Sequence, residues 1–257
     1  MPEIFDKSAV FIPIDGPGRR FSSSRRVRMG DVDPANEIRF DALARYAQDI
    51  ANDDALDVQI PAAMDFVIRK STVLVNRPAS FRETVEVTTF CNGIGGRWAG
   101  RQTKIVGDRG ADIDISAVWV HINRESGVPR RLGETFLDGY QESAVGRKVS
   151  TKLAQRGDPP KDAKGQPWPF RWTDFDLLGH VNNAAYWPAV EQVISQLGIA
   201  RTRLRVELEF RNPAPPDSHA VLLWAPCPTS PSEATAEMWL VDSAGDTTYA
   251  TATLSPF

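Results

Sequence analysis

An internal repeat constrains this chain more than any other feature of its sequence. The segment RVRMGDVDPANEIRF at positions 26–40 has the same rhythm of polar and apolar residues as PFRWTDFDLLGHVNN at 169–183. Self-similarity of this kind indicates that one structural unit occurs twice. At an offset of 143 positions the two segments align Arg28 with Arg171, Asp31 with Asp174, and Asp33 with Asp176.

A helical pattern follows each copy. After the first copy, apolar residues recur at helical spacing at Phe40, Leu43, Ala47 and Ile50. After the second copy a similar stripe ends at Gly198, a typical C-terminal cap, with Pro188 in the first turn, where its missing N–H costs little. The residues of this second stripe are Tyr186, Val190, Val193, Ile194 and Leu197.

About four strand patterns follow each helix. In RLRVELEF at 203–210, apolar residues alternate with Arg and Glu, which predicts a strand with one buried and one solvated face. The glycine cluster at 93–96 lies between two strand patterns, so we expect a hairpin turn and not a phosphate-binding loop. One helix on an antiparallel sheet, repeated twice, predicts an α+β fold in which the two sheets pair.

A basic segment rich in Pro and Gly separates the copies. The predicted boundaries are an N-terminal domain at 1–143, a linker at 144–168 and a C-terminal domain at 169–257. The linker is either a solvated connector or a docking surface for an acidic partner.

Composition excludes several classes of protein. The chain has 257 residues, 42% of them apolar, and a formal net charge of −3, so it is neither disordered nor a generic nucleic-acid-binding protein. No apolar run reaches the length of a membrane span, and the acidic N-terminus does not resemble a signal peptide, which predicts a cytoplasmic location. Cys91 and Cys227 have no partner at metal-ligand spacing, and we expect buried free thiols.

The second copy contains the residues best suited to chemistry. Asp176 and His180 lie four positions apart, and Asn182 and Asn183 follow directly before the helix. Each could be purely structural: a turn residue, a buried histidine or a helix cap. Together, an acid, an imidazole and an amide at a helix N-terminus could activate water and stabilise an oxyanion, as acyl transfer requires.

The segment RWTDFDLLGHVNNAAYW resembles the signature of hot-dog-fold thioesterases, and the whole repeated chain resembles the acyl-acyl-carrier-protein thioesterases of plants and bacteria. The resemblance implies a tandem hot-dog fold, a pseudo-dimer of two helix-wrapped antiparallel sheets. It further implies hydrolysis of fatty acyl thioesters in fatty acid biosynthesis, with the catalytic residues in the second domain.

The resemblance matches Asp176 and His180 to two of the family's catalytic residues, and with Asn182 they form an Asp-x-x-Gly-His-x-Asn motif similar to that of single-domain hot-dog thioesterases. Asp176 would be the general base or nucleophile, His180 would orient it or polarise the carbonyl, and Asn182 would hold the helix start beside the oxyanion. The rest of the plant network is missing, because Leu178 replaces a catalytic Asn, and Pro213 and Ala214 replace a Glu-Cys pair.

The first copy is expected to be catalytically silent, because it keeps Asp33 but has Glu37 and Arg39 where the second has His180 and Asn182. Three aromatic residues near the second motif are candidates for lining an acyl channel or for the core: Trp172, Tyr186 and Trp187.

The resemblance implies no metal or organic cofactor, an acyl carrier protein as partner, and either a monomeric pseudo-dimer or a homodimer. Three alternatives stay open: an acyl-CoA thioesterase, an enoyl-thioester hydratase and a non-catalytic acyl-binding protein. For docking of an acidic carrier, the candidate bases are Arg19, Arg20, Arg25, Arg26, Arg28, Arg147, Lys148 and Lys152.

Overall fold

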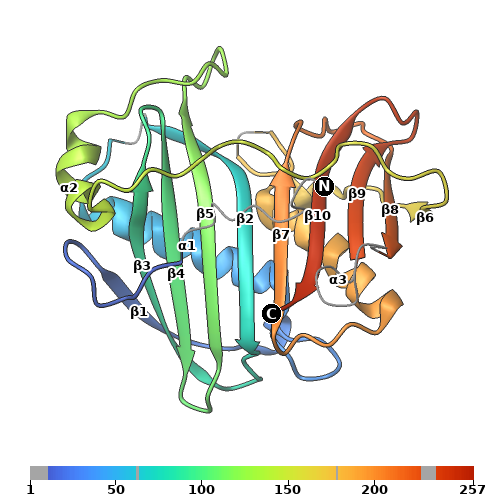
Figure 1. The fold of residues 1–257 in the computed structure, drawn as a ribbon, viewed down its shortest axis with the longest axis horizontal. Coiled ribbons are helices and arrows are strands. Elements are labelled where there is room, and N and C mark those ends of the chain that lie inside the picture. Colours follow the sequence, from blue (N-terminus) through green and yellow to red (C-terminus); the bar gives the residue numbers. More distant parts are fainter. Residues whose placement is uncertain (1–10, 62–63, 178, 227–235) are drawn as a thin grey trace.

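The computed structural model describes residues 11–61, 64–177, 179–226 and 236–257. In these ranges one antiparallel sheet of ten strands runs through the molecule, in the order β1-β3-β4-β5-β2-β7-β10-β9-β8-β6 (Figure 1). The strands of the first half are β1 (Phe21–Arg26), β2 (Asp65–Arg77), β3 (Thr84–Ile94), β4 (Trp98–Gly107) and β5 (Asp112–Ile122). Those of the second half are β6 (Lys164–Pro167), β7 (Leu204–Phe210), β8 (Ala220–Pro226), β9 (Ala236–Asp242) and β10 (Thr248–Pro256).

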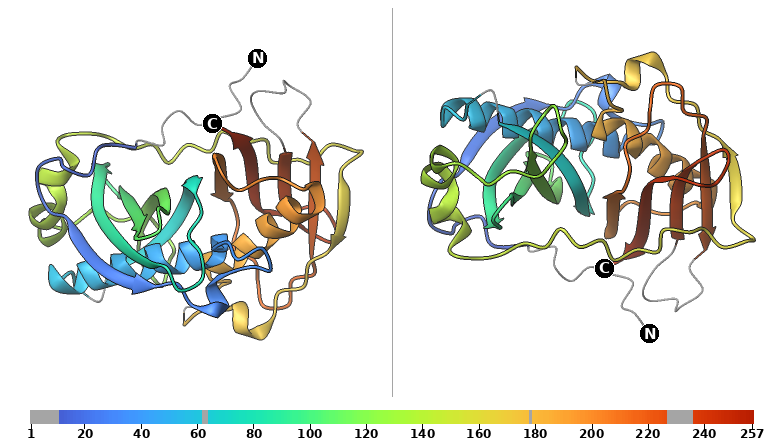
Figure 2. Two further views of the ribbon diagram at one scale, coloured as in Figure 1. Left: turned by 90° about the horizontal axis from the view of Figure 1, so that it is seen from below. Right: turned by 90° about the horizontal axis from the view of Figure 1, so that it is seen from above.

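The helices lie mainly on one side of this sheet. The long helix α1 (Phe40–Asp57) covers the first half, and α3 (Trp187–Leu197) covers the second (Figure 2). A third helix, α2 (Glu134–Ala144), packs beside β3 and was not expected from the sequence. Short 3-10 helices are η1 (Met29–Asp31), η2 (Trp172–Asp174) and η3 (Asn183–Tyr186). None of the described helices is long and apolar enough to cross a membrane.

The two halves of the sheet are related by the sequence repeat. Their strand orders mirror each other about the junction of β2 and β7, where Val73 lies opposite Val206. Each half has one more strand than expected. The additional strands are β1 and β6, which form the outer edges of the two halves. β6 falls within the segment predicted as a linker.

The predicted helical stripes form the core. Phe40, Leu43 and Ile50 of α1 are buried, and the Phe40 ring stacks on Trp187 with centroids 5.6 Å apart. Gly198 ends α3 in the left-handed conformation, at φ 63°, and Pro188 lies in its first turn, as predicted. The glycine cluster at 93–96 is a hairpin turn, as predicted, in which Gly95 N–H donates to the Trp98 carbonyl at 2.7 Å.

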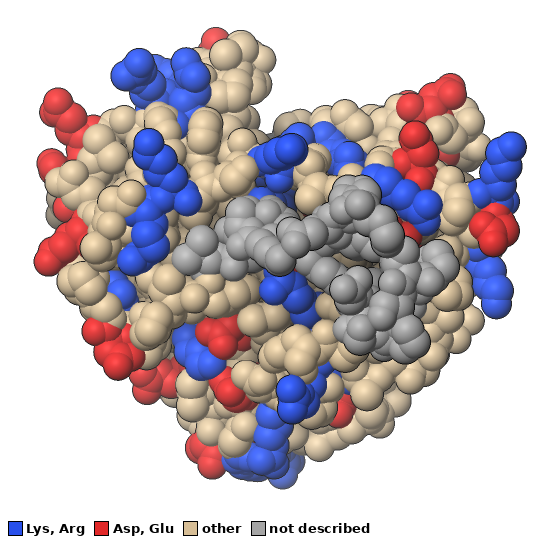
Figure 3. Space-filling view, viewed as in Figure 1, with Lys and Arg blue, Asp and Glu red and all other residues tan. Residues whose placement is uncertain are grey.

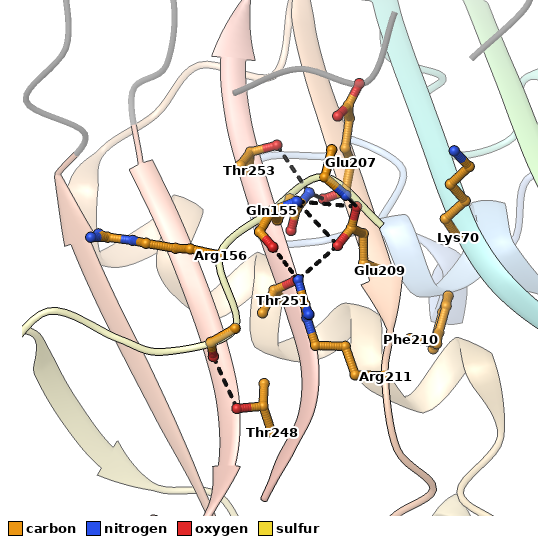
Figure 4. Close-up of polar contacts among 12 residues, drawn as sticks. Lys70, Gln155, Arg156, Glu207, Glu209, Phe210, Arg211, Thr248, Thr251 and Thr253 are labelled. Atoms are coloured by element: carbon orange, nitrogen blue, oxygen red, sulfur yellow. Dashed lines mark hydrogen bonds and ion pairs between the residues drawn. The ribbon is translucent and has the colours of Figure 1, made fainter. Parts of the chain in front are cut away.

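One expectation about β7 is wrong. Glu207 and Glu209 were predicted on a solvated face, yet they are only 4% and 2% exposed. The reason is the segment after α2, which crosses this face of the sheet (Figures 1 and 4). Gln155 donates to the Glu207 carbonyl at 2.9 Å, and Glu209 accepts the Ala154 N–H at 2.6 Å. This stretch is therefore bound to the sheet and is not a solvated connector.

Candidate active site

The two copies of the motif form the same hairpin. In the second copy Asp176 N–H donates to the His180 carbonyl at 2.9 Å, and Gly179 N–H donates to the Asp176 carbonyl at 3.0 Å. The first copy makes the same two bonds. Asp33 N–H donates to the Glu37 carbonyl at 2.9 Å, and Asn36 N–H donates to the Asp33 carbonyl at 3.0 Å. Gly179 and Asn36 both have positive φ, +74° and +64°, which glycine and asparagine adopt with least strain. The repeat seen in the sequence is therefore also present in the structure.

The surroundings of the two copies differ sharply. A cavity of about 400 Å³ opens beside the second motif, and Asp176, Leu177, Asn182 and Asn183 line it. The other lining residues that the structure describes all belong to the first half of the chain. These walls are formed by α1, by β2 to β5 and by α2, and the apolar residues among them include Ala51, Ala55, Ile60, Met64, Phe66, Ala99, Trp119 and Phe136.

The structure places the three predicted catalytic residues unequally. Asp176 and Asn182 line the cavity, whereas His180 is exposed and lies outside the lining. Asn182 caps η3, because its Oδ1 accepts the Ala184 N–H at 2.9 Å. Leu178 lies outside the described residues. Ala214 is fully buried in the core.

Of the three candidate channel aromatics, none lines this cavity. Trp172 is 90% exposed, whereas Tyr186 and Trp187 are buried. Trp187 contributes to a second, much smaller cavity of about 30 Å³ between α1 and the sheet. The core interpretation is therefore correct for Tyr186 and Trp187.

In the first copy, ion pairs bind the acidic residue of the motif. Arg201 is only 8% exposed; its Nη1 lies 2.5 Å from Asp33 Oδ2, and its Nη2 pairs with Glu191. Burial alone would raise the pKa of Asp33, but hydrogen bonds from the Glu37 N–H and from Arg201 outweigh it and lower the pKa. Asp33 is thus held as an ionised partner of Arg201, away from the cavity.

The cavity wall holds a charged network that the sequence did not reveal. Asp54 is fully buried and accepts hydrogen bonds from Arg101 Nη1 at 2.6 Å, Tyr140 at 2.9 Å and Arg19 Nε at 2.6 Å. Burial, with the Asp54 carboxylate nearby, raises the pKa of Tyr140 to about 12, so its hydroxyl stays a donor. Arg101 and Tyr140 line the cavity, which therefore has one polar wall.

Cys91 also lines the cavity and is 2% exposed. Burial raises the pKa of its thiol, which disfavours the nucleophilic thiolate. Cys227 lies outside the described residues. We expect Cys91→Ala to keep kcat within about twofold, since a buried thiol of raised pKa is a poor nucleophile. Steady-state hydrolysis of an acyl-CoA measures this, and a loss of turnover in a folded variant would assign Cys91 a catalytic role.

Together, the paired helix-wrapped sheets define a double hot-dog protein, with a mainly apolar cavity that the acidic motif of the second copy helps to line. The chain belongs to the acyl-ACP thioesterase family: residues 18–140 match the model of the family's N-terminal domain and residues 157–248 that of its C-terminal domain. It is accordingly a thioester hydrolase that acts on fatty acyl thioesters.

The chain is similar to curated proteins of bacteria and plants. An uncharacterised protein of Mycobacterium tuberculosis is 24% identical over 197 residues, which cover 76% of this chain and 78% of the relative. The chloroplastic acyl-[acyl-carrier-protein] hydrolase FATB3 of Cuphea viscosissima is 27% identical over 161 residues, 60% of this chain and 39% of the plant protein.

Solved structures show the same fold. The 12:0-ACP thioesterase of Umbellularia californica superposes with a TM-score of 0.73 at 18% identity, covering 93% of this chain and 94% of that one. An acyl-ACP thioesterase of Bacteroides thetaiotaomicron gives 0.72 at 14% identity, with 92% and 97% covered. The predicted tandem hot-dog fold is therefore confirmed.

Proposed function

We propose that this protein releases fatty acids from acyl carrier protein in the cytoplasm, with Asp176 as general base. The observation that carries the proposal is that Asp176 and Asn182 both line a cavity whose other lining is mainly apolar. An acyl chain would lie among the apolar walls, and its thioester carbon would then lie beside Asp176.

The proposed reaction is a hydrolysis by water. Asp176 takes a proton from a water molecule, whose oxygen attacks the carbonyl carbon to form a tetrahedral oxyanion. The carbon–sulfur bond then breaks as the oxyanion collapses to the carboxylic acid, and the sulfur takes the proton held by Asp176 and leaves as the carrier thiol. Asn182 holds the start of η3 beside the oxyanion, and His180 orients Asp176 from the other end of the hairpin.

Rates over a series of acyl lengths, on both carrier protein and CoA, test the proposal. We expect a higher kcat/KM on the carrier. Equal or higher values on CoA would favour an acyl-CoA thioesterase, and acyl binding without thiol release would make the protein a binding module.

Several of the docking bases suggested by the sequence are already engaged within the chain. Arg19 pairs with Asp54 and Asp57, and Arg25 with Asp49. Arg147 donates to the Asn92 carbonyl at 3.0 Å and the Ser143 carbonyl at 2.7 Å. Replacing Arg147 would therefore disturb the local structure as well as any docking surface.

Another basic surface lies at the cavity. Lys and Arg side chains gather over the loop between β5 and α2 (Figure 3). Arg124 lines the cavity and pairs with Asp65, and Arg130 and Arg131 are exposed in the same loop. The exposed Arg97 belongs to the same surface. Its carbonyl accepts the His121 N–H at 2.9 Å, which places it beside the end of β5, where this loop begins. An acidic carrier docked here would present its acyl group to the cavity mouth.

We expect Arg130→Glu combined with Arg131→Glu to raise KM for acyl carrier protein about tenfold and to weaken its salt dependence, with kcat unchanged. Charges at the rim of an interface act mainly on association and are screened by salt. Hydrolysis of the matching acyl-CoA is the internal control. The exposed linker pair, Lys148→Glu with Lys152→Glu, is the matched variant; a larger effect there would move the docking surface to the linker.

A further inference from the structure

Gln48 of α1 faces the proposed reaction centre from the opposite half of the molecule. It lines the large cavity together with Asp176, Asn182 and Asn183, and it also lines the small cavity together with Asn183. Its side chain makes no hydrogen bond with any residue that the structure describes. The side chain is partly exposed and lines the cavity, so its amide is accessible to a molecule bound there, and none of the roles above uses it.

The internal repeat identifies a counterpart for this amide. The offset that aligns Arg28 with Arg171 also aligns Gln48 with Glu191 of α3, and Phe40 with Asn183. The counterpart pair is in contact, because Glu191 Oε1 accepts the Phe40 N–H at 2.6 Å. In the first copy, an oxygen held by the facing helix therefore occupies the start of α1.

Charge explains why the two copies differ at this position. Glu191 is mostly buried beside Arg201, which binds its other oxygen and also binds Asp33. In the first copy, the position corresponding to the cavity is therefore occupied by the Glu191 carboxylate, and Arg201 neutralises its charge. At the second site the facing residue is the neutral Gln48, and its amide can donate two hydrogen bonds where a carboxylate could only accept them.

We propose that Gln48 is a catalytic residue whose amide donates a hydrogen bond to the carbonyl oxygen of the thioester. In the first copy a Glu191 oxygen lies between α3 and the start of α1. In the second copy the substrate oxygen takes the equivalent place, between Gln48 of α1 and the start of η3. The bond strengthens as the carbonyl oxygen gains negative charge in the tetrahedral intermediate. A carboxylate at position 48 would instead repel that charge.

This inference rests on the proposed function, so its test has a catalytic and a binding readout. We expect Gln48→Met, similar in size but without a donor, to lower kcat by about 10²-fold with little change in KM, the typical cost of removing one oxyanion donor. Gln48→Glu should lower kcat further because of its charge. Glu191→Gln is the matched control in the other copy, and it should keep kcat. Thermal unfolding checks that each variant folds.

The binding readout compares two non-hydrolysable acyl-CoA analogues by calorimetry. In one, a methylene group replaces the sulfur and the carbonyl is kept; in the other, an alkyl thioether, the carbonyl is absent. The wild-type protein should bind the ketone more tightly, and Gln48→Met should abolish this preference. If the wild-type protein hydrolyses no thioester but shows the preference, and Gln48→Met loses it, the proposed function fails, while the hydrogen bond from Gln48 to the ligand carbonyl stands as a binding contact. Normal turnover or an unchanged ketone preference in Gln48→Met would overturn the assignment.

Discussion

Replacing Asp176 by Asn is expected to lower kcat for acyl thioester hydrolysis by about 10²-fold or more, the scale of positioned acid–base catalysis. The amide keeps the size of the side chain but cannot accept a proton from water. Binding of the acyl chain should change little, because the apolar cavity walls come from the other half of the molecule. Steady-state kinetics and calorimetric binding of a non-hydrolysable analogue measure the two effects separately.

The repeat supplies the matched control, Asp33→Asn. Asp33 makes the same hairpin, but Arg201 binds it and it does not line the cavity. This variant should lose stability and keep turnover. A folded Asp176→Asn protein with near-normal kcat would remove Asp176 from the mechanism, and an equal loss in Asp33→Asn would indicate two cooperating sites.

His180→Ala tests the imidazole separately. The His180 group that accepts the Asp176 N–H is the backbone carbonyl, so alanine preserves this bond of the hairpin and removes the ring. We expect kcat to fall by about 10²-fold, because in the proposed mechanism the ring orients Asp176. Unchanged turnover would restrict His180 to its backbone role.

The largest expected effect on stability comes from Arg201→Leu. The guanidinium joins Asp33 of the first copy to Glu191 of the second, and all three side chains are mostly buried. Removing it leaves two carboxylates without their cation, and breaking a buried ion pair in this way costs about 3–5 kcal/mol. Urea unfolding at pH 7 measures the change.

Two controls make this result specific. The exposed Arg26→Leu should change the free energy of unfolding by less than about 0.5 kcal/mol. Adding Glu191→Gln to Arg201→Leu should recover part of the loss, since one unpaired charge is then removed. If Arg201→Leu is as stable as Arg26→Leu, the network does not join the two copies energetically.

Much of the architecture follows from the sequence because it depends on local patterns. Residues a few positions apart determine the helical stripes, the caps at Gly198 and Asn182, and the hairpin at 93–96. The repeat adds the pairing of two equivalent halves, because each copy of the unit leaves a sheet edge to be covered. The position of Asp176 next to the helix start is also local, since only six residues separate it from Asn183.

The tertiary structure alone decided which side chains meet across long sequence distances. Gln48 faces a motif more than a hundred residues later, and Arg201 reaches back to Asp33. The burial of Glu209 depends on Ala154 and Gln155, which lie in a segment that composition alone marked as solvated. Such contacts leave no periodic signal, because the partner of a polar side chain is set by how the sheet halves pack and not by its sequence neighbours.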